Sequence, residues 1–166
     1  MFYRKFTNSI KGEITLAINL SKEKLTYMYG RMLEIRFFEE KVFDLYAQNL
    51  VPGTIHLYLG EEAVAVGVCS ILRKDDYITS THRGHGHCIA KGAELKKTMA
   101  EILGKKTGYC KGKGGSMHIA DFSIGMLGAT AVVGAGLPIA VGAALSIKLR
   151  KADQVVACFF GEGASN

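Results

Sequence analysis

The chain has 166 residues and a mass of 18.0 kDa, enough for about one domain with its own core, so a small disulfide-stapled scaffold is excluded. With 48% hydrophobic and 22% charged residues, the composition is that of a folded protein and excludes a disordered or fibrous one. A net charge of +6 and 20 glycines are its unusual features.

The positive charge lies in one segment, from His82 to His118. This segment holds eight basic and two acidic residues, a balance equal to the net charge of the whole chain, and four of the five histidines. An anionic ligand or partner is therefore expected. The simpler interpretation, for five of the lysines, is that they form the solvated face of a helix (Lys91, Lys96, Lys97, Lys105 and Lys106).

Cysteine usage and hydropathy bear on the compartment. The four cysteines form no C-x-x-C pair, and the N-terminal residues contain no apolar run of signal-peptide length, so a reduced, cytoplasmic chain is expected. Residues 124–147 carry no formal charge. Several glycines and Pro138 interrupt this stretch, and we expect no membrane span there.

Residues 1–20 are interpreted as an N-terminal extension and residues 21–166 as one domain. Ser21 is a suitable N-cap for a helix that reaches about Asn49, because apolar residues follow at steps of three and four (Leu25, Met28, Met32, Ile35, Val42 and Leu45). A second, mostly buried helix is predicted over residues 61–72.

The rest of the chain alternates between strand and helix signals. A strand at Tyr77–Ser80 runs into a basic loop, T-H-R-G-H-G-H. Residues 94–103 are predicted as a helix that Gly104 ends, before a glycine-rich segment without regular structure. Residues 138–150 are predicted as the last helix, and Gln154–Phe160 as a continuous apolar strand of the buried, parallel kind. This order predicts an α/β fold, a parallel sheet flanked by helices, with ligands beyond the carboxyl ends of its strands.

Two polar residues follow predicted strands. Glu162 lies in G-E-G-A-S, where backbone N–H groups suit a phosphate and the carboxylate suits a hard cation such as Mg²⁺, although a tight strand-to-helix turn has the same pattern. The guanidinium of Arg83 can bind a phosphate through two hydrogen bonds. The alternative for Arg83 is a pair with a surface carboxylate.

The histidines allow other interpretations. Within seven residues the basic loop holds four side chains of types that bind zinc (His82, His85, His87 and Cys88). A His-rich metal-binding module is therefore an alternative, although the spacing is not that of a zinc finger. A nucleic-acid module is disfavoured, because Tyr109 is the one aromatic residue in the basic segment. His56 stands between two apolar residues, where a core histidine competes with a general acid or base.

Five stretches together resemble a known family: I-H-L, T-H-R-G-H-G-H, C-K-G-K-G-G-S-M-H-I-A, A-V-V-G-A-G and F-F-G-E-G-A-S-N. From about Leu25 to Asn166 the chain is similar to the alpha subunit of the thiamine-diphosphate-dependent decarboxylating component of 2-oxo acid dehydrogenase complexes. The resemblance implies a thiamine-diphosphate-binding fold. It also implies thiamine diphosphate and Mg²⁺ bound between an alpha and a beta subunit of an α2β2 heterotetramer.

The resemblance implies roles for individual residues. His56 falls on the active-site histidine that helps bind and protonate the thiamine-bound intermediate. The implied cofactor-binding positions hold the diphosphate (His82, Arg83), meet the aminopyrimidine through the backbone (Val133) and form the loop that carries metal and diphosphate (Gly161, Gly163, Ala164). Glu162 falls where the family has Asp, and its extra methylene extends the carboxylate by about 1.5 Å.

The two motifs T-H-R-G-H-G-H-C-I-A-K-G and G-S-M-H-I-A-D resemble acetoin dehydrogenases more than pyruvate enzymes. The implied activity is thiamine-diphosphate-dependent C–C cleavage of acetoin by an oxidoreductase, with the lipoyl group of an acyltransferase component as acceptor; a pyruvate or other 2-oxo acid dehydrogenase is the alternative. The 166 residues lack the downstream half of the family's cofactor motif. We therefore expect an N-terminal fragment, with the C-terminal half of the fold missing, that is inactive alone.

Overall fold

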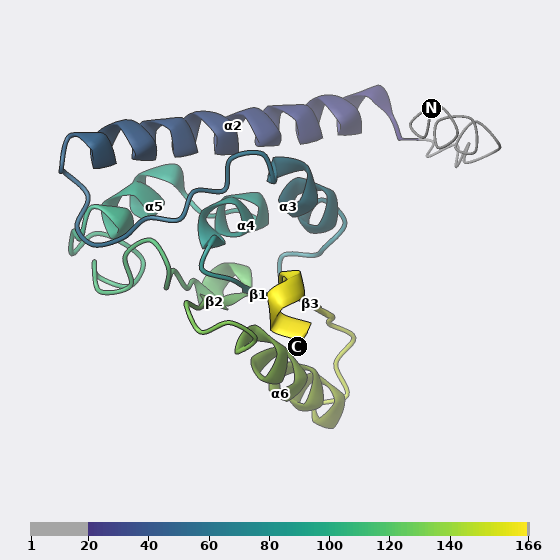
Figure 1. The fold of residues 1–166 in the computed structure, drawn as a ribbon. Coiled ribbons are helices and arrows are strands. Elements are labelled where there is room, and N and C mark those ends of the chain that lie inside the picture. Colours follow the sequence, from purple (N-terminus) through teal and green to yellow (C-terminus); the bar gives the residue numbers. More distant parts are fainter. Residues whose placement is uncertain (1–19, 166) are drawn as a thin grey trace, which may run out of the picture.

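The computed structural model of the chain describes residues 20–165, and the expected N-terminal extension lies outside them except for Leu20. A long helix lies across three shorter ones, and a last helix lies on the other side of a small sheet (Figure 1). The helices, in chain order, are α2 (Lys22–Ala47), α3 (Glu62–Cys69), α4 (Gly84–Lys91), α5 (Leu95–Ile102) and α6 (Gly136–Leu149).

The sheet is parallel, as predicted, and its strand order is β2-β1-β3. Its strands are β1 (Tyr77–Ser80), β2 (Met126–Ala129) and β3 (Val156–Cys158). On the central strand, Ile78 pairs with Met126 on one side and with Ala157 on the other. The carboxyl ends of the three strands therefore lie at one edge of the sheet, where α/β folds bind their ligands.

The long helix begins as predicted. The Ser21 side chain accepts a hydrogen bond from the backbone N–H of Lys24 at 3.2 Å, which satisfies one of the free donors of the first turn. Ile35 and Val42 are fully buried against the core, whereas Leu25, at the start of the apolar stripe, is 52% exposed. The stripe therefore enters the core only after its first turn.

The structure differs from the sequence-based prediction at two strands. The predicted buried strand Gln154–Phe160 is shorter, Val156–Cys158, and its side chains are half buried, because β3 is an outer strand of the sheet. The second strand, β2, was not predicted, since its sequence M-L-G-A includes a glycine and no β-branched residue.

The sequence predicts a loop for the basic segment after β1. In the structure this segment forms α4, which begins at Gly84. A Cβ atom at Gly84 would lie 2.5 Å from the Cβ of Ala129, and one at Gly86 would lie 2.0 Å from the ring of Tyr58. These glycines therefore let the helix pack closely against the sheet and the core. Lys91, expected on a solvated face, is buried at the end of α4 and donates to the carbonyls of Arg73 and Lys74.

The uncharged stretch of residues 124–147 is divided between β2, a loop and α6. Among residues 20–165, no helix combines the length and the hydropathy that a membrane span requires. The four cysteines are free, two of them buried and two half buried, as expected for a reduced chain (Cys69, Cys88, Cys110 and Cys158).

The glycine-rich segment after α5 has no helix or strand, as predicted, and it is organised around one buried carboxylate. Glu101 is fully buried. Its two oxygens accept hydrogen bonds from the backbone N–H groups of Cys110, Gly112, Gly114 and Gly115 at 2.7, 2.9, 2.8 and 3.2 Å. Four backbone donors that no regular structure satisfies are thus satisfied by one side chain.

We expect Glu101→Gln to lower the free energy of unfolding by about 3 kcal/mol, because the amide nitrogen leaves two of the four buried N–H groups without an acceptor. Glu94→Gln is the control: Glu94 is exposed and pairs with Lys97 at 2.7 Å, a surface pair worth about 0–1 kcal/mol. Urea unfolding of the two variants measures the difference. Equal, small losses would show that the Glu101 carboxylate does not hold the segment.

Candidate functional site

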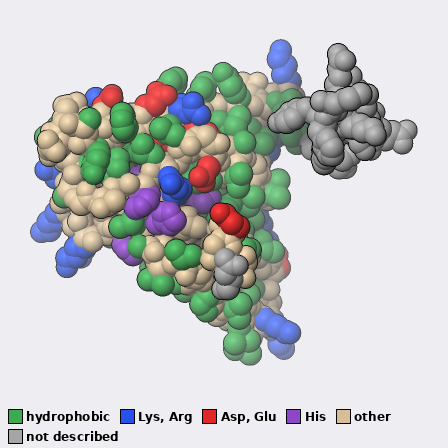
Figure 2. Space-filling model, in the orientation of Figure 1, with side chains coloured by type: hydrophobic (Ala, Val, Ile, Leu, Met, Phe, Trp, Pro, Cys, Tyr) green, Lys and Arg blue, Asp and Glu red, His purple; other side chains and the backbone are tan. Residues whose placement is uncertain are grey.

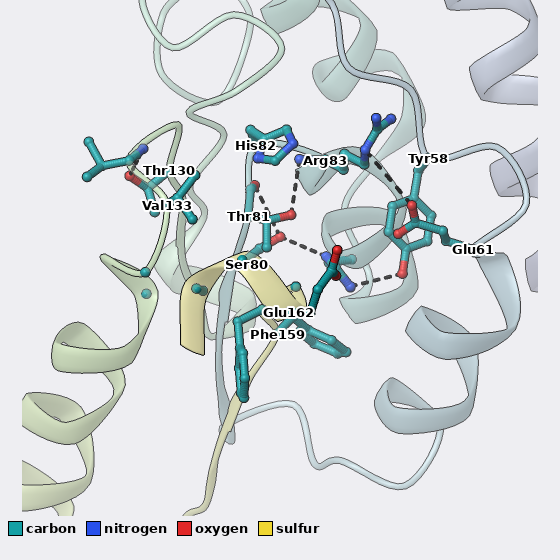
Figure 3. Close-up of a pocket in the computed structure, with 18 of the residues that line it drawn as sticks. Tyr58, Glu61, Ser80, Thr81, His82, Arg83, Thr130, Val133, Phe159 and Glu162 are labelled. Atoms are coloured by element: carbon teal, nitrogen blue, oxygen red, sulfur yellow. Dashed lines mark hydrogen bonds and ion pairs between the residues drawn. The ribbon is translucent and has the colours of Figure 1, made fainter. Parts of the chain in front are cut away.

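A cavity of about 550 Å³ opens at the carboxyl ends of β1 and β3 (Figure 3). Its walls come from the ends of the three strands and the segments that follow them, from the starts of α4 and α6, and from residues in or near α3 (Ser80–Arg83, His87, Thr130, Val132–Gly134, Gly136, Phe159–Ala164, Tyr58, Glu61 and Val64). The volume is typical of a site for a small molecule. Figure 2 shows histidine side chains gathered on this face beside basic and acidic ones.

All the cofactor-binding residues expected from the sequence line this one cavity (His82, Arg83, Val133, Gly161, Gly163 and Ala164), and so does Glu162. His56 does not line it. Its ring lies edge to face against the ring of His82, with the ring centroids 4.8 Å apart. The structure therefore brings residues up to 82 positions apart in the sequence to one place, with His56 against His82 at its wall.

Arg83 precedes α4 and reaches the rim of the cavity. Its Nη1 donates to the carbonyl of Leu57 at 2.5 Å, and its Nε lies 3.9 Å from a carboxylate oxygen of Glu61 (Figure 3). The alternative interpretation of Arg83, a pair with a surface carboxylate, is thus also present in the structure. The contact is long and both side chains are about half exposed, so the pair holds Arg83 only weakly.

Glu162 opens a single 3-10 turn, η2 (Glu162–Ser165), which follows β3 after residues 159–161. The turn is exposed, and the Glu162 side chain extends toward the middle of the cavity in Figure 3. No group of three His, Cys, Asp or Glu side chains in residues 20–165 is arranged to hold a metal ion. A carboxylate such as that of Glu162 is the type of group that binds Mg²⁺ beside phosphates.

The metal-binding module considered for the basic segment is wrong. His85 Nδ1 lies 2.9 Å from the Glu39 carboxylate, and its Nε2 lies 2.9 Å from Ser116 Oγ. His87 likewise has partners at both ring nitrogens, and Cys88 is fully buried. Since the lone pairs and protons of both rings are already engaged within the protein, a zinc ion would have to break these bonds.

Three residues of the cavity form a hydrogen-bonded group that the sequence did not reveal. His87 Nδ1 lies 2.7 Å from Ser80 Oγ, and its Nε2 lies 2.9 Å from the Tyr58 hydroxyl. The His87 ring stacks on Phe159, with ring centroids 3.8 Å apart. Ser80 was within reach of prediction as the last residue of β1, but nothing in I-H-L-Y marks Tyr58 as a cavity residue.

His56 is held beside other polar side chains. Its backbone N–H donates to Ser116 Oγ at 3.2 Å, and its buried Nδ1 has no hydrogen-bond partner among residues 20–165. Burial, followed by the nearby His82 and Arg83, lowers the pKa of His56 below the ordinary histidine value. The lowered pKa favours the neutral ring, which is the form that accepts a proton.

Taken together, the cavity offers a guanidinium, backbone N–H groups of a turn, a carboxylate and apolar walls. Such a site suits a small molecule with an anionic end and a less polar ring. The arrangement is therefore that of an α/β protein with a site suited to a phosphorylated small molecule at the carboxyl edge of its parallel sheet.

Comparison with known proteins narrows this class. The profile of the family "Dehydrogenase E1 component" matches residues 30–166. The chain is 61% identical over 149 residues to the alpha subunit of acetoin:2,6-dichlorophenolindophenol oxidoreductase from Bacillus subtilis, and 53% identical over 150 residues to the subunit of the same name from Cupriavidus necator. It is 42% identical over 156 residues to the pyruvate dehydrogenase E1 component subunit alpha of Porphyra purpurea.

The chain belongs to the dehydrogenase E1 component family. Each of these three matches covers 90% of the chain and 45% of the relative, so the chain spans about half the length of the curated relatives it matches. Membership implies thiamine diphosphate as the cofactor. The cavity fits this group: Arg83 and the Glu162–Ser165 turn suit a diphosphate, and Val132, Val133 and Phe160 offer apolar surface to its rings.

The buried histidine of the cavity makes an acid-sensitive contribution to stability. Burial lowers the pKa of His87 from 6.5 to about 3. Between these two pH values the unfolded chain binds a proton that the folded chain does not bind, so stability falls as the pH falls. We expect the free energy of unfolding to drop between pH 7 and pH 5 by about 2 kcal/mol more in the wild type than in His87→Gln.

Urea unfolding at the two pH values measures this difference, with His118→Gln as the matched control, because His118 is exposed. The control should lose as much stability as the wild type on acidification. A His87→Gln variant that is just as acid-sensitive as the wild type would show that His87 is protonated in the folded chain.

Proposed function

We propose that this chain is the amino-terminal part of the alpha subunit of a thiamine-diphosphate-dependent acetoin dehydrogenase. The observation that carries the proposal is the single cavity that collects Arg83, Val133 and the turn Gly161–Ala164 at the carboxyl edge of the sheet. The higher identity to the two acetoin enzymes than to the pyruvate enzyme supports acetoin as the substrate.

The residues of the chain would divide the work around the cofactor. Arg83 and the backbone of the turn Gly161–Ala164 would hold the diphosphate, the backbone at Val133 would meet the aminopyrimidine, and Glu162 would be the carboxylate ligand of Mg²⁺. Thiamine diphosphate supplies the stabilised carbanion chemistry that C–C cleavage needs. His56 stands against His82 at the wall of the cavity, from where it would exchange a proton with the reacting group.

A partner subunit would close the site. The side chains of Val132 and Val133 are 66% and 65% exposed at the cavity. Apolar side chains of α6 are also exposed (Ile139, Val141, Leu145 and Leu149). Exposed apolar surface of this kind is typical of subunit contacts. The proposal assigns it to a beta subunit in a heterotetramer, with a lipoyl-bearing acyltransferase as acceptor; location in the cytoplasm stays a prediction.

The test of this function is the turnover of the full-length alpha subunit that carries these residues, assembled with its beta subunit. We expect reduction of dichlorophenolindophenol with acetoin, dependent on added thiamine diphosphate and Mg²⁺, and a lower kcat/KM with pyruvate. The isolated 166-residue chain is the control and should be inactive. A preference for pyruvate would show that the enzyme is a pyruvate dehydrogenase instead. Turnover without thiamine diphosphate would contradict the proposed function.

Arg83 gives a test by binding alone. Arg83→Ala removes a charge-assisted contact to the diphosphate, so we expect the affinity of the assembled enzyme for thiamine diphosphate to fall by about 10-fold to 100-fold. Arg83→Lys should recover only part of it, since an ammonium group cannot make the bidentate contact. Calorimetric titration at fixed Mg²⁺ measures both. Arg73→Ala, which removes a surface pair with Asp153, is the control, and unchanged affinity in Arg83→Ala would remove Arg83 from the site.

A further inference from the structure

Three buried polar side chains form an unbroken series of hydrogen bonds behind the cavity. Glu39 on α2 and His85 on α4 are fully buried, and Ser116 in the glycine-rich segment is 5% exposed. The Glu39 carboxylate oxygens lie 2.9 and 3.1 Å from His85 Nδ1, and His85 Nε2 lies 2.9 Å from Ser116 Oγ. Ser116 Oγ in turn accepts the backbone N–H of His56 at 3.2 Å.

The carboxylate sets the direction of the series, since a carboxylate only accepts hydrogen bonds. In the tautomer that donates Nδ1–H to Glu39, the Nε2 of His85 accepts the Ser116 hydroxyl. This leaves the lone pairs of Ser116 Oγ free for the His56 amide. Each group therefore orients the next, and the carboxylate at one end fixes the acceptor that the His56 backbone meets at the other.

Packing of α2 against α4 does not by itself call for this arrangement. Burying a carboxylate, an imidazole and a hydroxyl costs free energy that apolar side chains of similar size would avoid. The polar groups are nevertheless completely partnered, and their bonds converge on one backbone group. That group belongs to His56, whose side chain stands against His82 at the wall of the cavity.

We propose that Glu39, His85 and Ser116 are positioning residues that hold His56 in place for proton transfer, an inference that rests on the proposed function. Among residues 20–165, the bond to Ser116 is the hydrogen bond that ties His56 to the rest of the chain, because its Nδ1 has no partner. We name the three residues the Glu39–His85–Ser116 relay. Without it, the His56 segment between α2 and α3 loses its anchor on the glycine-rich segment.

Ser116 is not itself a nucleophile, although the sequence of carboxylate, imidazole and hydroxyl is the one found in hydrolases. Its side chain is buried, it does not line the cavity, and its oxygen is occupied by the His56 N–H. A nucleophile needs an exposed oxygen beside a place for substrate. The relay thus acts through His56 and has no direct contact with a ligand in the cavity.

A double-mutant cycle on the assembled enzyme tests the relay. We expect Ser116→Ala to lower kcat for acetoin by about 10-fold to 100-fold, because small misplacement of a catalytic group is costly, with less than about 3-fold change in KM. In a His56→Ala background, Ser116→Ala should lower kcat by less than about 2-fold. Glu39→Gln provides a second variant should Ser116→Ala not assemble, with the same expected pattern.

Two further measurements separate positioning from a general structural effect. Calorimetry should give the same affinity for thiamine diphosphate in Ser116→Ala as in the wild type, and in histidine-labelled enzyme the nuclear magnetic resonance signal of the His56 ring should shift or broaden while that of His118 does not. Ser70→Ala is the matched control, since it removes a hydroxyl that donates to the carbonyl of Gly67 at 3.0 Å, away from the cavity. It should leave kcat and the His56 signal unchanged.

The outcomes distinguish the relay from the proposed function. A loss of kcat on Ser116→Ala that is equally large with and without His56 would overturn the relay and leave the proposed function intact. An unchanged His56 signal in Ser116→Ala would do the same. A His56→Ala variant with full kcat would overturn the role given to His56 in the proposed function, and the relay with it.

Discussion

The buried carboxylate of Glu101 is the interaction on which the site depends. It accepts hydrogen bonds from four backbone N–H groups of the glycine-rich segment. This segment contains no helix or strand that would satisfy these groups. Because the carboxylate fixes Gly114 and Gly115, it fixes the residue that follows them, Ser116. The conformation of the segment is thus set by one side chain of a neighbouring helix, and the position of Ser116 follows from it.

Three side chains at the start of α4, within five residues of the sequence, have different surroundings. Arg83 precedes the helix and reaches the rim of the cavity, His85 turns inward to Glu39, and His87 faces Ser80 and Tyr58 at the cavity. Successive positions two apart on a helix point about 200° apart, so neighbouring histidines necessarily face different surroundings. The close approach that Gly84 allows packs the start of α4 against Ala129 of β2, and His87 then meets Ser80 of β1.

The sequence predicted correctly those parts of the fold that residues close together in the chain determine. The cap at Ser21, the strand Tyr77–Ser80 and the helix end before Gly104 are set by residues at those positions, and the structure confirms them. The strand β2 and the start of α4 were missed because they depend on tertiary contacts. A four-residue strand with a glycine is specified by its pairing with β1, and a helix with two glycines by what it packs against.

The site residues, too, include some that the sequence predicted and some that it did not. The cavity residues that follow strands were predictable, since ligands in parallel sheets bind at carboxyl ends. Glu39 and Tyr58 were not, because a glutamate in an amphipathic helix and a tyrosine in a loop have no distinguishing local pattern. His85 and His87 were considered as alternative metal ligands, but in the structure both are hydrogen-bonded within the protein. Residue type alone therefore indicated polar chemistry, and only the three-dimensional contacts showed which chemistry.

The contact between Arg83 and Glu61 shows that the two interpretations of the arginine are compatible. At 3.9 Å and with both side chains about half exposed, this ion pair stabilises the chain by only about 0–1 kcal/mol. A diphosphate that accepts two parallel hydrogen bonds from the guanidinium competes well with such a partner. Glu61 and the carbonyl of Leu57 therefore hold the guanidinium at the rim of the cavity, and the bond to Leu57 joins Arg83 to the segment that carries His56.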